Sequence, residues 1–168
     1  MGSDDLTRDE PGALADAIAA LLKAKKQTVA VSESSAGGLI DAALVAVPGA
    51  SAFYLGGCIV YTTASREGLL GITAEDMKGM RSASEPYARL VASRIREKLG
   101  ATWALSETGA SGPTGNRYGD APGHACFAVA GPVAASVTLE TGSSDREANM
   151  RAFARRALEL LQECLKKA

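Results

Sequence analysis

The chain has little of what builds a disulfide-stabilised or metal-binding protein. Its 168 residues include three cysteines and a single histidine, and no two cysteines are close in sequence. Small secreted domains depend on paired cysteines, and zinc sites need clusters of Cys and His. The sequence therefore predicts reduced, buried thiols, no metal or other cofactor, and a cytoplasmic protein.

The chain also lacks a charge excess and a long hydrophobic run. Lys and Arg number 18 against 19 Asp and Glu, so the net charge is -1. Nucleic-acid binding depends on a basic surface, and this balance argues against it. The longest apolar stretch, residues 39–47, is interrupted by Asp41 and is too short to span a bilayer. We expect neither nucleic acid nor a membrane as a partner.

Aromatic residues are scarce, at 5%, although hydrophobic residues reach 46%. The core must therefore be built mainly from Ala, Leu, Val and Ile, which suits Ala-rich helices packed on a small sheet. The length fits a single domain. We assign residues 11–168 to this domain and interpret the polar residues 1–10 as disordered or tag-derived.

Helical and strand-like patterns alternate along the chain. The sequence therefore predicts an α/β fold, a single three-layer domain with helices on both faces of the sheet. The sheet is expected to be mixed and mostly parallel, with an antiparallel hairpin at its end. The predicted strands are residues 28–32, 57–61, 103–106, 124–130 and 134–139. The predicted helices are residues 11–26, 39–47 and 84–99, a short helix after residue 63, a helix with a capped start at 73–76, and a last helix from a capping box at 144–147 to about residue 166.

A glycine-rich loop, residues 33–38, follows the first predicted strand and contains Ser34, Gly37 and Gly38. Ligands of open α/β sheets bind beyond the carboxyl ends of the strands. The helix that follows points its free N–H groups back at the loop, which favours an anion or a developing oxyanion. Ser34 is then a candidate nucleophile. The alternative is a serine-rich helix cap whose glycines serve packing.

The second glycine-rich loop, residues 108–115, alternates hydroxyl side chains with glycines and includes Thr108, Gly109 and Gly112. Its donors suit a phosphate or a polar substrate, because glycine lets the backbone approach a ligand closely. A long loop in a compact domain is usually functional or disordered. The alternative is therefore a flexible connection between two strands.

Three further side chains are expected near this site. Tyr61 ends the second predicted strand, Arg66 lies one turn into the helix that follows, and Arg146 lies in the first turn of the last helix. A cation in a first turn opposes the helix dipole, which points to a use for Arg146. Solvated side chains are the alternative for both arginines. We interpret His124 as structural, because nothing in the sequence places it near Ser34.

Together, these residues resemble the C-terminal domain of the CinA (competence/damage-inducible) family, from about Ala13 to Leu165. Better characterised members are nicotinamide-nucleotide amidases, which convert nicotinamide mononucleotide to nicotinic acid mononucleotide and ammonia. The family motifs occur in order: Glu-Ser-x-Thr-Gly-Gly is similar to residues 33–38, Pro-Gly-x-Ser to 48–51, Tyr-Ser-Asn-x-x-Lys to 61–66, Val-Ser-Glu to 83–85, Thr-Gly-x-Ala-Gly-Pro to 108–113, and Gly-Asp-Arg to 144–146.

The resemblance implies a serine amidohydrolase that acts on a small nucleotide, needs no cofactor and forms a homo-oligomer. It implies that Ser34 is the nucleophile and that Thr108 and Arg66 occupy catalytic positions. The residues expected to bind the substrate are Glu33, Gly37, Gly38, Tyr61, Gly109, Gly112 and Arg146.

Several residues depart from the family pattern, among them Thr62 and Thr63 in place of Ser-Asn, and two departures bear on the chemistry. Ala36 replaces the motif threonine, and Arg66 replaces a lysine. A desolvated lysine can lose its proton and serve as a base, whereas arginine effectively cannot. A nucleotide-binding module without turnover is therefore the main alternative to an amidase. An interaction domain whose glycine loops are only structural is a third hypothesis.

Overall fold

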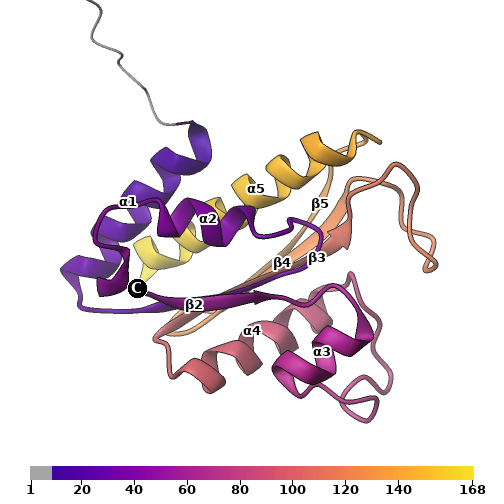
Figure 1. Ribbon diagram of the computed structural model, residues 1–168, viewed down its shortest axis with the longest axis horizontal. Coiled ribbons are helices and arrows are strands. Elements are labelled where there is room, and N and C mark those ends of the chain that lie inside the picture. The colour runs from indigo at the N-terminus through magenta and orange to yellow at the C-terminus, as the bar shows by residue number, and fades with distance from the viewer. Residues whose placement is uncertain (1–8) are drawn as a thin grey trace, which may run out of the picture.

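A five-stranded sheet with helices on both faces forms the described part of the chain, residues 9–168 of this computed structural model (Figure 1). The strands are β1 (Val29–Glu33), β2 (Tyr54–Ile59), β3 (Trp103–Ala110), β4 (His124–Ala130) and β5 (Ala135–Glu140). They lie in the order β2-β1-β3-β4-β5. β1 is parallel to β2 and β3, and β4 is antiparallel to β3 and β5. Only β4 therefore runs against the others, which confirms the predicted mixed, mostly parallel sheet.

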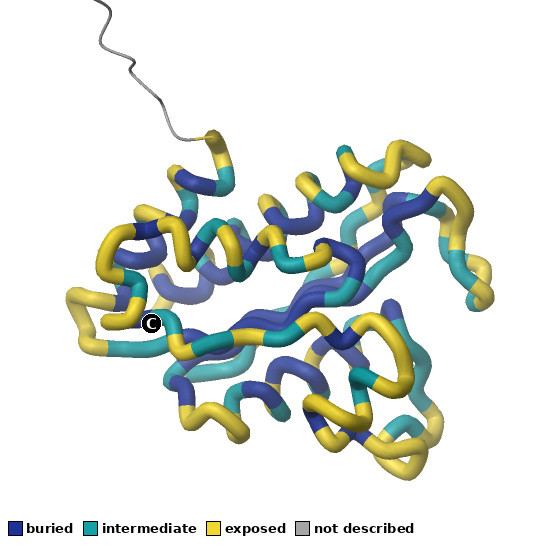
Figure 2. Tube along the Cα trace, viewed as in Figure 1, coloured by how far each residue is buried: buried dark blue, intermediate teal, exposed yellow. Residues whose placement is uncertain are grey.

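Two helical layers enclose the sheet. Helices α1 (Glu10–Ala24), α2 (Leu39–Val45) and α5 (Arg146–Lys167) cover one face, and α4 (Glu85–Leu99), with α3 (Thr63–Leu70) beside it, covers the other (Figure 1). The core has one part in each layer, with Ile18, Phe153 and Leu158 on the first side and Val91 and Ile95 on the second. Figure 2 shows the buried residues along the central strands and the inward helix faces. The predicted three-layer domain is confirmed.

Local signals explain the best-predicted helix, α4. The Ser84 side chain accepts the Tyr87 amide hydrogen and so caps the first turn. Gly100 ends the helix in a left-handed conformation, φ +64°, that glycine adopts without a steric penalty. The sequence predicted both ends, so α4 begins and ends where expected.

Two predicted helix starts are wrong. The backbone amides and side chains of Thr73 and Asp76 form the reciprocal hydrogen bonds of a helix cap. Only turns follow these residues, however, and the turns end at Gly79, which adopts φ +73°. The last helix is capped by Asp145, whose carboxylate accepts the Ala148 amide hydrogen, and not by the expected capping box of Ser144. In the first case the pattern marked a polar turn that no helix follows; in the second the helix was predicted correctly, and only its capping residue differs by one position.

Two strands also differ from expectation. β3 continues to Ala110, because its ladder with β4 extends from Ala104 to the pair formed by Ala110 and His124. Thr108 and Gly109 therefore lie in a strand and not in a loop. β2 begins at Tyr54 and ends at Ile59, so Tyr61 follows the strand instead of ending it.

The chain start lies mostly outside the described residues. We interpreted residues 1–10 as disordered or tag-derived, and the first eight of them lie outside the described residues. Asp9 caps α1, because its side chain accepts the Gly12 amide hydrogen at 2.9 Å. The three cysteines are free thiols. None of the helices in residues 9–168 has both the length and the apolar character that a membrane crossing requires.

Candidate functional site

A buried glutamate fixes the loop that carries Ser34. Glu107, in β3, accepts the amide hydrogens of Ser34 at 2.8 Å and Ala36 at 3.0 Å. The hydroxyl of Ser35 contacts the other carboxyl oxygen of the same side chain. Glu107 is 1% exposed, and burial raises its pKa because water no longer stabilises the charged form. The loop between β1 and α2 is therefore attached to the neighbouring strand before any ligand binds.

A second buried glutamate fixes the other end of this loop. Glu33 accepts the amide hydrogens of Gly38 at 3.1 Å, Ile40 at 3.0 Å and Asp41 at 2.8 Å. Its carboxyl oxygens thus satisfy amide hydrogens at the start of α2 that have no partner within the helix. Burial, together with the neighbouring Asp41, raises the pKa of Glu33 to about 8. Glu33 is fully buried and is absent from the wall of the cavity described below.

The glycine amides of this loop are also occupied by the protein. The Gly37 amide hydrogen is donated to the Ser34 carbonyl oxygen at 3.1 Å, and the Gly38 amide hydrogen is donated to Glu33. The expectation that these two N–H groups face an oxyanion therefore has no support from the geometry. In this loop, the amide of Ser35 has no hydrogen-bond partner among the described residues.

A cavity of about 360 Å³ opens beyond the carboxyl ends of β2, β1 and β3. It is lined by Ser34 after β1, Tyr61 and Arg66 after β2, and Thr108 and Gly109 at the end of β3. Three neighbouring parallel strands thus deliver side chains to one place, as the strand-end rule predicts. The cavity brings together all three residues expected at catalytic positions, and two of those expected to bind substrate.

Ser34 is half-buried in this wall, and its hydroxyl has no hydrogen-bond partner among the described residues. A serine nucleophile usually lies beside a base that accepts its proton. Arg66, in the same wall, carries a guanidinium, which has hydrogen-bond donors and no acceptor. The hydroxyl is thus accessible to a ligand, but no neighbouring side chain activates it.

Thr108 contributes an oriented hydroxyl. Its Oγ1 accepts the Ala83 amide hydrogen at 3.1 Å, and the residue is 4% exposed. A hydroxyl that accepts one hydrogen bond keeps its own hydrogen for donation. Thr108 is therefore prepared to donate to a ligand in the cavity.

Arg66 forms a cationic part of the wall. Its Nη1 donates to the Ser82 hydroxyl at 3.3 Å, and its guanidinium lies 5.8 Å from the centre of the Tyr87 ring. Its Nε is buried and has no partner in residues 9–168. A planar guanidinium with donors to spare suits a carboxylate or a phosphate.

Arg146 is not in the cavity wall, contrary to its expected contact with substrate. Its guanidinium donates to the Gly112 carbonyl oxygen and, at 2.9 Å, to the Tyr61 hydroxyl. Gly112 adopts φ +110°, and a Cβ there would lie 2.9 Å from the Ser144 carbonyl oxygen. Arg146 therefore joins the two chain segments that leave β2 and β3. Gly112, like Gly37 and Gly38, does not line the cavity.

The sequence analysis missed one side of the cavity. Asn116, Arg117 and Tyr118 line it from the loop between β3 and β4. The hydrogen bond from Arg117 lowers the pKa of the Tyr118 phenol. The signal was a basic residue beside an aromatic one within a glycine-rich loop, but a loop sequence does not reveal which of its side chains turns inward.

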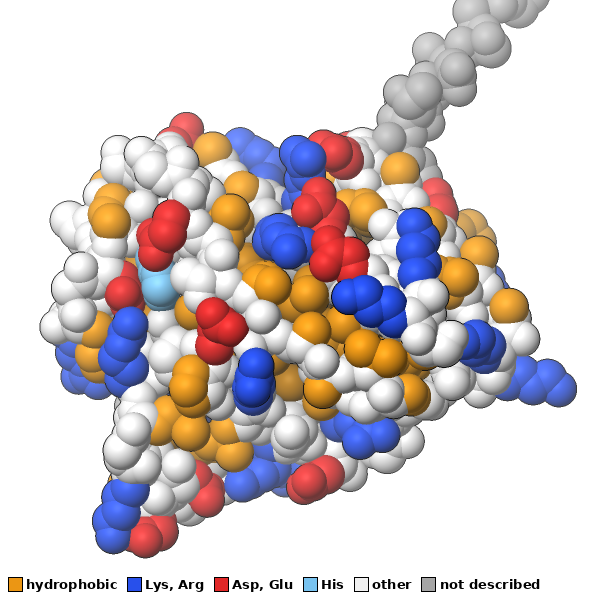
Figure 3. Space-filling view, turned by 180° about the vertical axis from the view of Figure 1, so that it is seen from behind, with side chains coloured by type: hydrophobic (Ala, Val, Ile, Leu, Met, Phe, Trp, Pro, Cys, Tyr) orange, Lys and Arg blue, Asp and Glu red, His pale blue; other side chains and the backbone are white. Residues whose placement is uncertain are grey.

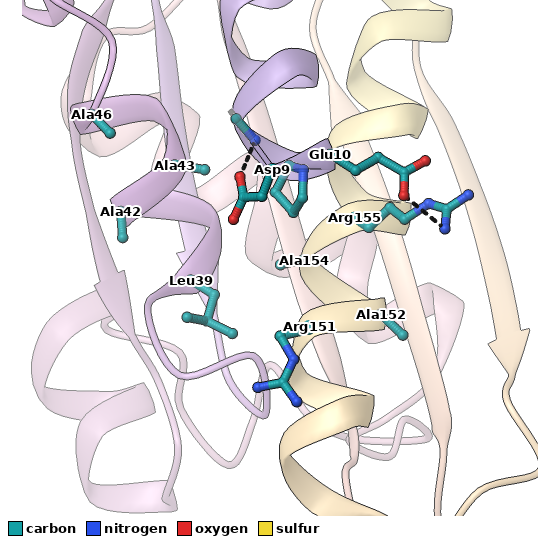
Figure 4. A pocket seen from close by; sticks show the side chains of 12 residues that line it. Asp9, Glu10, Leu39, Ala42, Ala43, Ala46, Arg151, Ala152, Ala154 and Arg155 are labelled. Atoms are coloured by element: carbon teal, nitrogen blue, oxygen red, sulfur yellow. Dashed lines mark hydrogen bonds and ion pairs between the residues drawn. The ribbon is translucent and has the colours of Figure 1, made fainter. Parts of the chain in front are cut away.

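A larger hollow of about 620 Å³ lies elsewhere, between α1, α2 and α5 (Figure 4). It is lined by alanines such as Ala42, Ala43 and Ala154 and by the charged residues Arg151 and Arg155. Its lining contains no Ser, Thr, Cys or His and none of the predicted site residues, so the smaller cavity is the candidate site. Among residues 9–168, no cluster of His, Cys, Asp and Glu has the arrangement that holds a metal ion.

Comparison with known sequences identifies the family. Residues 12–165 match the CinA C-terminal domain. A CinA-like protein of Prochlorococcus marinus (strain MIT 9313) is 40% identical over 131 residues, covering 78% of this chain and 29% of that protein. A CinA-like protein of Anaeromyxobacter dehalogenans (strain 2CP-1 / ATCC BAA-258) is 37% identical over 153 residues, covering 91% and 38%. The chain spans about a third of the length of these relatives.

Solved structures agree with the sequence match. A CinA superfamily protein from Klebsiella pneumoniae 700603 superposes with a TM-score of 0.87 at 26% identity, covering 94% of this chain and 99% of that one. The competence/damage inducible protein CihA from Agrobacterium tumefaciens gives 0.87 at 26% identity, covering 96% and 99%. The family match covers nearly the whole chain, and the fold matches too. The chain belongs to the CinA C-terminal domain family.

Proposed function

We propose that the cavity binds a small phosphorylated carboxamide, of which nicotinamide mononucleotide is the leading candidate, and hydrolyses its amide bond. The observation that carries this proposal is the convergence of Ser34, Thr108 and Arg66 from three different elements on one cavity. A volume of about 360 Å³ lies in the range of small-molecule sites.

In the proposed reaction, Ser34 Oγ attacks the carboxamide carbon, and the serine proton passes to the leaving nitrogen, which departs as ammonia. Water then attacks the acyl-enzyme, releases a carboxylic acid and restores the serine hydroxyl. The free amide of Ser35 and the hydroxyl of Thr108 are the proposed donors to the oxyanion. An amide directly after the nucleophile serves the same purpose in other serine hydrolases.

The phosphate is assigned to Arg66 and Arg117, because both guanidinium groups line the cavity. The tyrosines Tyr61, Tyr87 and Tyr118 give the same wall aromatic surface for a pyridine ring. Arg146 is then a positioning residue, because its guanidinium is engaged with Gly112 and Tyr61. We also propose a homo-oligomer, which sedimentation equilibrium at several protein concentrations tests.

Ammonia release from nicotinamide mononucleotide tests the amidase proposal directly. Wild type, Ser34→Ala and Arg66→Lys are compared, and Arg151→Lys serves as a control because Arg151 lies outside the cavity. We expect activity in wild type and a loss of at least about a hundredfold in Ser34→Ala, since the nucleophile is gone. Activity that survives Ser34→Ala overturns the assignment of the nucleophile.

A nucleotide-binding module without turnover is the second candidate. The unpartnered hydroxyl of Ser34 favours it, because no described side chain accepts the serine proton. In that case wild type binds nicotinamide mononucleotide in a calorimeter but releases no ammonia. A gain of activity in Arg66→Lys then identifies the missing base, since lysine can lose a proton in a desolvated site and arginine cannot.

A further inference from the structure

His124, the only histidine in the chain, stands behind the cavity wall at the start of β4. Its ring contacts hydrogen-bond acceptors on both sides: Nδ1 lies 2.5 Å from Glu140 Oε1, and Nε2 lies 2.7 Å from the Ala83 carbonyl oxygen. A carbonyl oxygen can only accept, and an ionised carboxylate can only accept. Both ring nitrogens must therefore carry hydrogen to satisfy both contacts, which is the imidazolium form.

Ala83 needs this support because of its backbone. It adopts φ +54°, a left-handed conformation that is uncommon for a residue with a Cβ. Such a conformation persists only where the surroundings hold it. His124 holds the Ala83 carbonyl, and the Ala83 amide hydrogen goes to Thr108 Oγ1 at 3.1 Å. A chain of hydrogen bonds thus runs from Glu140 through His124 and Ala83 to the hydroxyl in the cavity.

We propose that His124 is a positioning residue which, as the imidazolium, holds Ala83 in its left-handed conformation and thereby orients the Thr108 hydroxyl toward the ligand. His124 itself does not line the cavity. The task of Thr108 as a substrate donor rests on the proposed function, whereas the mechanical link from His124 to Thr108 does not.

The charges around His124 favour the protonated ring. Glu140 approaches from β5, and Asp120, in the loop before β4, lies 3.6 Å from Nε2 and is itself held by Arg81. Cys126 Sγ lies 3.8 Å from Nε2 and also contacts Thr138, which binds Glu85 of α4. Burial lowers the pKa of His124, but the hydrogen bonds and charges outweigh it and raise the pKa above the ordinary value. Figure 3 shows the histidine among acidic side chains on the surface.

The raised pKa of His124 determines how the orientation of Thr108 changes with pH. A histidine whose folded pKa is raised contributes its full stabilisation below the unfolded pKa of about 6.5, and the contribution is lost as the pH rises through the folded value. The orientation of Thr108 is therefore strongest below the unfolded pKa of about 6.5 and weakens as the pH rises through the folded pKa of His124.

NMR on the ligand-free, untagged chain tests the link, because a single histidine gives unambiguous ring signals. We expect the amide signals of Ala83 and Gly109 and the methyl signal of Thr108 to titrate with the His124 ring nitrogens, at the same midpoint. In Glu140→Gln the midpoint moves to lower pH, because a charged acceptor is gone. Glu97→Gln, an exposed substitution on α4, leaves it unchanged.

Two results overturn the proposal: Ala83 and Thr108 signals that do not follow the ring, or a midpoint that Glu140→Gln leaves in place. If His124→Gln folds, we expect the titration of the Ala83 and Thr108 signals to disappear. If that variant does not fold, the midpoint in Glu140→Gln tests the proposal by itself. If nicotinamide mononucleotide is a substrate, Glu140→Gln also moves the alkaline limb of the kcat profile to lower pH. If no ammonia is released, the amidase proposal fails, while the NMR result still decides the role of His124.

Discussion

Two loops, residues 34–38 and residues 111–123, both contribute residues to the cavity wall. The contacts that hold the two loops in place differ in burial and in charge. Two carboxyl groups that are almost fully buried, Glu33 and Glu107, hold the first loop through its backbone amides. The second loop is held at its start by one buried hydrogen bond, from Asn149 to the Ser111 carbonyl oxygen. Beyond Ser111 it is held by Arg146, which is exposed, and by the ion pair of Arg81 with Asp120, in which the arginine side chain is 40% exposed. Buried hydrogen bonds resist opening more than exposed ion pairs do.

The difference assigns separate tasks to the two loops. A nucleophile must stay in place, and the proposed nucleophile, Ser34, lies in the loop with buried anchors. Ligand recognition benefits from adjustment, and Arg117 and Tyr118 lie in the loop with exposed anchors. We therefore expect the wall that contains Ser34 to open less readily than the wall that contains Arg117 and Tyr118.

The largest expected effect comes from removing a buried anchor. Glu107→Ala leaves two backbone amide hydrogens and the Ser35 hydroxyl without their partner, so we expect the free energy of unfolding to fall by about 3 kcal/mol or more. Glu107→Gln is the matched control, because an amide can donate to Ser35 and accept both amide hydrogens. Urea denaturation measures both. A Gln variant as unstable as the Ala variant shows that the carboxyl group itself is required.

The pH dependence of stability tests the same anchors. Burial raises the pKa of Glu107, and it raises the pKa of Glu33 to about 8. Carboxyls with raised folded pKa values contribute full stability below their unfolded values near 4, and the contribution is lost as the pH rises through the folded values. We therefore expect the unfolding temperature to fall between about pH 4 and pH 8. In Glu107→Gln this fall is smaller, and an unchanged slope contradicts the assignment.

The smallest effect on stability is expected in the second loop. Arg146→Lys loses the guanidinium fork, in which one nitrogen reaches the Gly112 carbonyl and the other reaches the Tyr61 hydroxyl. The substitution nevertheless costs less than about 1 kcal/mol because the site is exposed. The loop itself opens more often, and trypsin cleaves faster after Arg117. Arg151→Lys, on the same helix, is the control. Equal cleavage rates in both variants refute the anchoring role of Arg146.

Much of the fold was predictable from local signals. Alternating helix and strand patterns gave the three layers, and Ser84 and Gly100 marked both ends of α4. The strand-end rule brought Ser34, Arg66 and Thr108 to one cavity. These features depend on residues that are close in sequence or on general topology, so the sequence contains enough information to find them.

The features of the site that the sequence did not predict depend on contacts between residues that are distant in sequence. Nothing near Ser34 indicates that its amide is held by Glu107, or that the Gly38 amide is taken by Glu33. The left-handed Ala83 has no sequence signal, because alanine carries no preference for that conformation. These features arise when the chain packs, and local patterns do not record packing.

The anchor between β3 and the loop after β1 has a consequence for the order of folding. Glu107 lies 73 residues after Ser34, so the Ser34 loop lacks its acceptor until β3 has paired with β1. Contacts between such distant residues are among the slower steps of folding, because a long loop must close first. During synthesis, the serine leaves the ribosome long before the glutamate that holds its loop. The cavity is therefore completed only after β3 has joined the sheet.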